Sequence, residues 1–181
     1  MTITCKPRIL LLCLLIFLSS AVALRAEEIS KEYQLKLAFI VNFARFITWP
    51  EESFSPENPQ VTLCVLGKNP FGNALGDVDG KKVGERTLKV KNIETLNKEQ
   101  QCHLLFAGQW EAASLAGLEA RILNHQPVVT VSDSAGFAAA GGVIELVLKD
   151  DKLSFVINNT AMKERRVRAS SSLLNLAASI R

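Results

Sequence analysis

The sequence predicts an α/β protein, a three-layer sandwich whose mainly parallel central sheet has an antiparallel hairpin at its edge and helices on both faces. Three observations predict this class. Strand-length apolar segments alternate with helix-length segments along the chain, which is typical of strand–helix–strand units. The segments 61–66 and 102–107 are apolar except for Thr62 and His103, which is typical of strands covered on both faces. Finally, the strand-length segments 143–148 and 153–157 flank a short charged turn at 149–152, which indicates a hairpin.

Residues 1–23 have the composition of a secretory signal peptide. Basic Lys6 and Arg8 precede the uninterrupted apolar run 9–17, and small residues then lead to a cleavage site. A second cleavage site follows Ala26. We therefore expect export to the periplasm and removal of this leader.

Two other interpretations of the leader fit less well. A retained membrane anchor needs about 20 apolar residues, and the run is shorter. A lipoprotein needs a small residue before its lipidated cysteine, whereas Leu12 precedes Cys13. The mature chain, residues 27–181, has the length of one domain with a single core, and we expect no membrane insertion after cleavage.

Charge argues against a nucleic-acid partner. Lys6, Arg8 and Arg25 are three of the 21 basic residues, so 18 remain against 18 acidic residues once they are removed. A nearly neutral mature protein lacks the basic surface that binds phosphate backbones.

The cysteines predict one disulfide. Cys5 and Cys13 leave with the leader, and Cys64 and Cys102 remain as an even pair in an oxidising compartment, where disulfides persist. The bond is either a structural staple or a redox-sensitive switch. His103 follows Cys102, but adjacent strand residues point to opposite faces, and no metal-ligand spacing such as C-x-x-C is present. We predict no metal site.

The first segment of the mature domain predicts a helix over residues 30–47, with Ser30 as its N-cap. Pro50 pushes the residue before it out of helical geometry. The helix is apolar nearly all round, so it is deeply buried or serves both the core and a second contact. The candidate residues for a partner or dimer contact are Phe39, Phe43, Phe46 and Trp49, and core packing is the alternative.

The remaining elements follow from local patterns. Besides the segments already named, we expect strands over residues 87–93 and 127–131. We expect further helices over residues 71–75, 109–124, 160–165 and 171–180.

Catalytic motifs are missing, so we predict no enzyme activity and no cofactor. The chain has no G-x-S-x-G elbow and contains two histidines. The segment 132–134 reads as a turn or a helix cap, and the glycine-rich segment 136–142 lacks the Lys-Ser/Thr of a phosphate-binding loop. A basic cluster forms either a solvated helix end or a site for an acidic partner or lipid headgroups; its members are Lys163, Arg165, Arg166 and Arg168.

An ordered series of segments resembles the YfiR family of periplasmic proteins. The first and longest reads EYQLKLAFIVNFARFITWP at 32–50. The others cover nearly all of the mature chain and are residues 63–67, 70–72, 101–106, 127–133, 136–137, 141–142, 155–158 and 170–177.

The resemblance implies an α/β YfiR-like domain over residues 27–181, often dimeric, that acts as a non-enzymatic repressor. It implies binding to the periplasmic domain of an inner-membrane diguanylate cyclase, which lowers cyclic di-GMP and biofilm formation, with modulation by redox state. Cys64 and Cys102 match the common cysteine pair of the family. A periplasmic small-molecule-binding module serving a sensor kinase or transporter is the alternative.

This chain departs from the family pattern in two places. Some relatives have a second cysteine pair around the segment that is here 136–144, where this chain has none. Arg166 stands where the family often has glycine.

Overall fold

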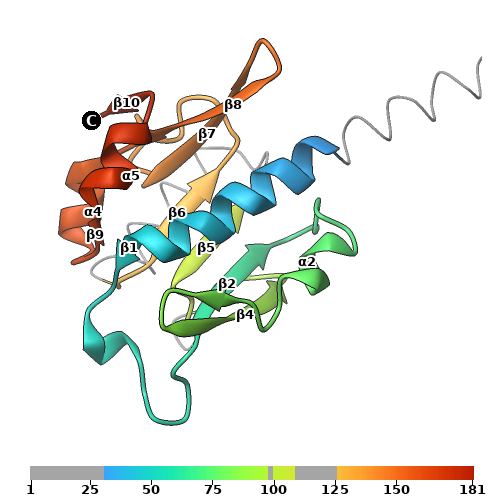
Figure 1. Cartoon of the computed structure of the whole chain (residues 1–181), viewed down its shortest axis with the longest axis vertical. Helices are drawn as coiled ribbons and strands as arrows, with labels where there is room; N and C mark the ends of the chain where they lie inside the picture. The colour runs from blue at the N-terminus through green and yellow to red at the C-terminus, as the bar shows by residue number, and fades with distance from the viewer. Residues whose placement is uncertain (1–30, 98–99, 109–125) are drawn as a thin grey trace, which may run out of the picture.

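A sheet of eight strands forms the centre of the fold (Figure 1). The computed structural model describes residues 31–97, 100–108 and 126–181. The strands lie in the order β10-β8-β7-β6-β5-β2-β4-β3. Within this order, the strands β7, β6, β5, β2 and β4 are all parallel to their neighbours in that group, and β8 is parallel to β10. The pairs β7–β8 and β3–β4 are antiparallel. The predicted α/β architecture with a mainly parallel sheet is confirmed.

The predicted long strands are present. Their observed bounds are β2 Val61–Leu66, β4 Arg86–Ile93, β5 Leu104–Ala107, β6 Val129–Ser132, β7 Ile144–Lys149 and β8 Lys152–Ile157. Asp150 and Asp151 form the two-residue hairpin turn, with φ of 50° and 57°, the left-handed geometry that such turns require.

Short strands add to this framework. Two of them, β3 (Lys82–Val83) and β10 (Ser179–Ile180), form the edges of the large sheet. Two more, β1 (Ile47–Thr48) and β9 (Arg168–Ala169), pair antiparallel in a separate sheet. The predicted hairpin therefore lies one strand in from the edge.

Within the described residues, the helices are short except for the first. It spans residues 31–46 and is followed by η1 (Glu51–Ser53), α2 (Ala74–Asp77), α4 (Asn159–Glu164) and α5 (Ser171–Leu176). No helix in the described ranges has the length and apolar character needed to cross a bilayer. The predicted extension of the last helix to residue 180 is wrong, because the chain leaves α5 and pairs with β8 instead, with Ala178 N–H donating to the Phe155 carbonyl oxygen over 2.8 Å.

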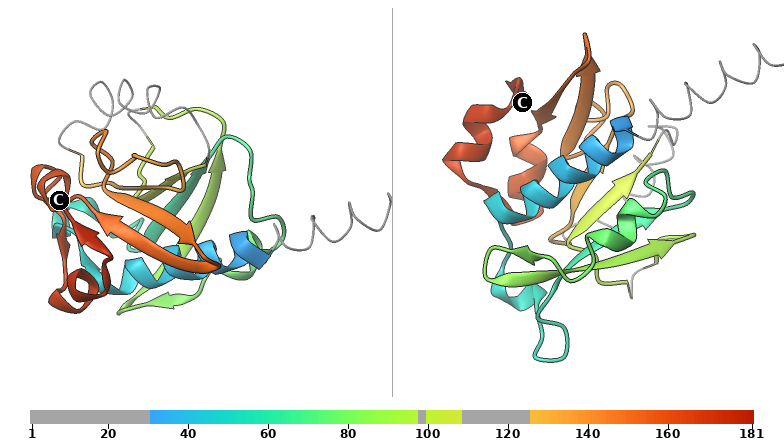
Figure 2. Two further views of the ribbon diagram at one scale, coloured as in Figure 1. Left: turned by 90° about the horizontal axis from the view of Figure 1, so that it is seen from above. Right: turned by 45° about the vertical axis from the view of Figure 1, so that its right-hand side comes forward.

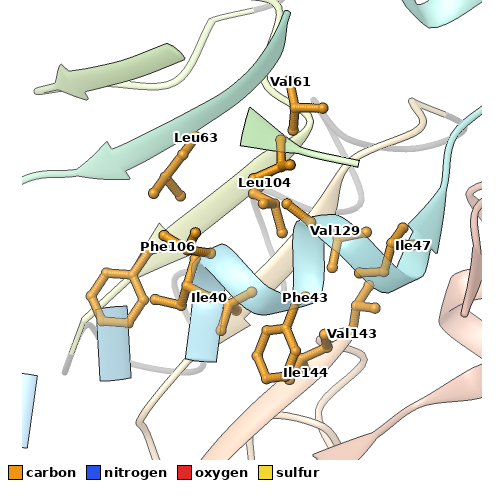
Figure 3. Packing of buried hydrophobic residues seen from close by; sticks show 14 of the residues in the cluster. Ile40, Phe43, Ile47, Val61, Leu63, Leu104, Phe106, Val129, Val143 and Ile144 are labelled. Carbon is orange, nitrogen blue, oxygen red and sulfur yellow. The ribbon is translucent and has the colours of Figure 1, made fainter. Parts of the chain in front are cut away.

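The helix over residues 31–46 covers one face of the sheet (Figures 1 and 2). Its inward side chains include Ile40 and Phe43, which pack against strand residues such as Leu104 (Figure 3). Phe43 also meets Phe155 of β8 with ring centroids 5.0 Å apart. The main core therefore lies between this helix and the sheet.

A second, smaller apolar cluster lies on the other face of the sheet. Its members are Cys64, Leu66, Ile93, Leu96, Cys102, Leu105, Ala107, Val128 and Phe137. Alternate residues of β2 and β5 supply the two clusters, as the period of two in a strand requires. The helix predicted at 109–124, the third layer of the sandwich, lies outside the described residues.

Candidate functional site

The predicted disulfide joins the middle of β2 to the segment that precedes β5. Cys64 and Cys102 are bonded, with Cα atoms 5.7 Å apart. The strands β2 and β5 are neighbours, with Cys64 opposite Leu105 in their register. This pairing places Cys102, two residues before β5, beside the strand that carries Cys64.

His103 occupies the next position and is fully engaged by backbone groups. Its Nδ1 accepts a hydrogen bond from Thr62 N–H over 3.0 Å. Nε2 therefore carries the proton and donates to the Ser53 carbonyl oxygen, 3.2 Å away. The ring links the start of the sheet to the loop that precedes β2. No set of three His, Cys, Asp or Glu side chains within residues 31–97, 100–108 and 126–181 is placed to hold a metal ion.

Aromatic and cationic groups stack on this histidine. Phe54 lies parallel to the ring with centroids 4.5 Å apart, and Arg86 lies over Phe54 at 3.5 Å. Trp49 meets the ring edge-on at 5.9 Å, and its Nε1–H donates to the His103 carbonyl oxygen over 3.2 Å. We call these four residues the His103 stack. It fixes the loop between the first helix and β2 on the edge of the sheet.

Burial lowers the pKa of His103 to about 4, and the positive charges of Arg86 and Lys91 act in the same direction. The Ser53 carbonyl opposes this effect. The imidazole is therefore neutral near pH 7. Its role in the stack is structural, because both of its nitrogens are already bonded.

Acid should destabilise the protein through His103. The folded pKa lies below the ordinary value of 6.5, so the unfolded chain binds more protons between these values. Neutral His103 makes its full contribution to the free energy of unfolding above pH 6.5. This contribution decreases as the pH falls towards 4, and by pH 4.5 about 2–3 kcal/mol of it is lost. Urea unfolding at pH 7 and 4.5 measures it. The variant His103→Asn should show a smaller pH dependence, and an equal dependence in both proteins would contradict this assignment.

The four candidate contact residues separate by exposure. Phe43 and Trp49 are 2% and 6% exposed, so they belong to the core. Phe39 is half-buried and packs edge-to-face on Phe43 and Phe155 at 6.2 Å. Phe46 is 38% exposed. Helical spacing places Leu35, which is also exposed, on the same side as Phe39 and Phe46, and we call these three residues the apolar stripe.

A basic groove lies where the chain leaves the first helix, and its lining begins two residues after Phe46. It has a volume of about 560 Å³, and its lining residues are Thr48, Trp49, Pro50, Glu52, Lys163, Arg166, Val167 and Arg168. β1 pairs with β9, and Ser170 N–H donates to the Phe46 carbonyl oxygen over 2.8 Å. Arg165 is buried instead. The basic cluster of the sequence is therefore divided, with three cations at the groove and one inside.

Arg166 closes α4 in a conformation that favours glycine. Its φ is 58°. Its N–H donates to the Lys163 carbonyl over 2.9 Å, and Val167 N–H donates to the Met162 carbonyl over 3.1 Å, which is a Schellman motif. Its side chain meets Glu52 with Nη1 and Oε1 2.9 Å apart.

Arg166→Gly should raise the free energy of unfolding by about 1 kcal/mol, because a left-handed non-glycine residue costs about that much. The lost Glu52 pair is exposed and contributes about 0.5 kcal/mol or less. Chemical denaturation measures the change. Arg166→Ala is the matched control, because it removes the ion pair and keeps the strain, so it should not gain stability. Equal free energies of unfolding for Arg166→Gly and Arg166→Ala would contradict the claim that the left-handed conformation at residue 166 costs stability.

A buried ion pair that was not predicted from the sequence lies at the opposite edge of the sheet. Lys36 Nζ lies 2.6 Å from Asp133 Oδ2, and the two side chains are 6% and 3% exposed. Lys36 also pairs with Glu32 and lies over the Tyr33 ring, 4.4 Å from its centroid. Burial alone would favour neutral lysine, but the hydrogen bonds to Asp133 and Glu32 outweigh burial and raise the pKa of Lys36. Helical spacing from Ile40 could have revealed that Lys36 faces inward.

The comparison with known families agrees with the resemblance found in the sequence. A family model described as YfiR/HmsC-like matches residues 33–178. A search among curated proteins gives no match. The match covers the first helix from its third described residue, the whole sheet up to its last strand and both cysteines. The chain therefore belongs to the YfiR/HmsC-like family. This is a regulatory family, and membership fits the role of a periplasmic regulator of diguanylate cyclases.

Proposed function

We propose that this protein is exported to the periplasm, binds the periplasmic domain of an inner-membrane diguanylate cyclase and holds that enzyme inactive. The family match over residues 33–178 carries this proposal. Repression lowers cellular cyclic di-GMP and biofilm formation. The state of the Cys64–Cys102 disulfide modulates repression.

A composite surface is the contact in this proposal. It combines the apolar stripe with the adjacent basic groove. Exposed aromatic side chains and arginines are the residues that most often dominate binding energy at protein interfaces. Three cations, Lys163, Arg166 and Arg168, face one carboxylate, Glu52, around the groove. The complementary surface of the cyclase should therefore carry acidic groups around an apolar site.

Repression requires a difference in affinity between two states of the cyclase. A regulator that bound the active and inactive states with equal affinity would not change the ratio of the two states, however tightly it bound. Converting a cyclase that is 99% active into one that is 99% inactive requires about 10⁴-fold tighter binding to the inactive state. The composite surface must therefore fit an arrangement that only the inactive cyclase presents.

Site-specific photo-crosslinking tests the contact in cells. A photoreactive residue at Phe46 should capture an inner-membrane protein that contains a diguanylate cyclase domain. The same residue at Lys82, an exposed position in the edge strand β3, is the control and should capture none. A product of twice the mass of this chain would instead assign Phe46 to a homodimer, and no product at either position would count against this surface.

Phe46→Asp should leave the protein folded and weaken repression at least about tenfold, because it places a charge at a desolvated contact. Urea unfolding and cellular cyclic di-GMP measure the two properties. Phe43→Ala is the contrasting variant, because Phe43 is buried, and it should lose stability instead. Normal repression by a folded Phe46→Asp protein would exclude Phe46 from the contact.

A further inference from the structure

We propose that Cys102 is the sulfur at which thiols attack the disulfide, so that Cys102 is a mixed-disulfide modification site and Cys64 is the leaving sulfur. Only the regulatory meaning of this reaction rests on the proposed function. The reaction itself depends on the two sulfur environments and can be measured on the isolated protein.

The two cysteines differ in access. Cys64 is 0% exposed and lies within β2, which is paired on one side with β4 and on the other with β5. Cys102 is 6% exposed and precedes β5. It also lines a pocket of about 200 Å³ at the amino-terminal edge of the sheet, which Cys64 does not line. A nucleophile from solvent can therefore approach Cys102 through this pocket, whereas paired strands enclose Cys64.

The pocket suits a thiol with a polar body. Its lining includes Gln100, Gln101 and Gln126, whose amides offer hydrogen bonds, and the guanidinium of Arg166. The attacking species in exchange is a thiolate. Arg166 and Glu52 both line the pocket and are paired with each other, so their charges offset, and the three glutamine amides supply the polar contacts.

The exchange follows the ordinary chemistry of disulfides. A thiolate of a small thiol or of a thiol–disulfide oxidoreductase attacks Cys102 Sγ and forms a new S–S bond. The Cys64–Cys102 bond breaks, and its electron pair leaves on Cys64 Sγ, which takes a proton from water. A second thiolate then attacks the incoming sulfur, which yields a small disulfide and free Cys102. The protein disulfide is reduced by two electrons, and the two thiols are oxidised.

Attack at Cys102 has a direct structural consequence. The reacting residue precedes His103, whose carbonyl accepts the hydrogen bond of Trp49. Trp49 in turn lines the basic groove. A bulky adduct at Cys102 is therefore connected to the composite surface through His103 and Trp49.

Glutathione is the probe that tests the assignment on the mature wild-type protein. Samples taken early in the reaction with glutathione are quenched with acid, and free thiols are blocked with N-ethylmaleimide. The masses of the tryptic peptides are then measured by mass spectrometry. Lys68 and Lys98 place the two cysteines in different peptides. Glutathione should be found on Cys102 at least about tenfold more often than on Cys64, with N-ethylmaleimide on Cys64. Equal labelling, or a preference for Cys64, would overturn the proposal.

Two controls separate access from intrinsic reactivity. In guanidinium chloride, where the chain is unfolded, the preference should disappear. In the single-cysteine variants, Cys102 of Cys64→Ala should react with Ellman's reagent at least about tenfold faster than Cys64 of Cys102→Ala, each rate divided by its value in denaturant. Similar ratios in two folded variants would contradict the assignment. No cyclase is present in either assay, so the outcome is independent of the proposed function.

Discussion

Replacing Lys36 with methionine should lower the free energy of unfolding by about 3–5 kcal/mol, because it leaves a buried carboxylate without its partner. Asp133 is enclosed and lies 2.6 Å from the lysine ammonium. Asp133→Leu should have an effect of similar size, because it leaves the ammonium with the half-buried Glu32 as its remaining carboxylate partner. Urea unfolding of each variant measures the change.

The double variant Lys36→Met, Asp133→Leu provides the decisive comparison. Apolar replacement of both members of a buried pair is often neutral or stabilising. The double variant should therefore be more stable than either single variant, with a coupling energy of at least about 2 kcal/mol in the cycle. Additive losses would mean that the two side chains act independently.

Removing the disulfide should also have a large effect. The bonded cysteines are separated by 38 residues, and closing a loop of this length in the unfolded chain stabilises the native state by about 4 kcal/mol. The double variant Cys64→Ala, Cys102→Ala should lose about that free energy of unfolding. The wild-type protein unfolded in the presence of a reductant should show a similar loss, and an unchanged midpoint under reductant would contradict the estimate.

The parts of the fold that the sequence predicts are those with a strong local pattern. β2 is apolar at every position except Thr62, so its burial on both faces and its bounds could be read directly. The hairpin turn at Asp150 and Asp151 was marked by four charged residues between two apolar segments. The disulfide was predicted from an even number of cysteines in a chain that we expect to be exported. Each of these signals lies in neighbouring residues or in composition.

The features that were missed depend on distant parts of the chain. β1 and β9 have two residues each, which is too short for any period, and each exists because the other pairs with it. The sequence from 171 to 180 allows a longer helix, but pairing of residues 179–180 with β8 ends it. Tertiary hydrogen bonds therefore overrode local preference at both places.

At the candidate site, too, the features that depend on distant parts of the chain were not predicted. The first helix is apolar nearly all round, so its pattern could not separate the buried Phe43 from the exposed Phe46. The bonds of His103 join the backbone of Thr62 to that of Ser53, and no spacing in the sequence indicates that these groups meet. Lys36 is the exception, because it lies four residues before Ile40 on the inward side of the helix and could have been identified.

Cellular cyclic di-GMP after deletion of the gene tests the central claim most directly. The proposed repressor predicts a rise that returns to the original level when the wild-type gene is restored, but not when the Phe46→Asp gene is restored at equal protein level. An unchanged concentration, under conditions in which the protein is made, would contradict the claim that this protein represses a diguanylate cyclase.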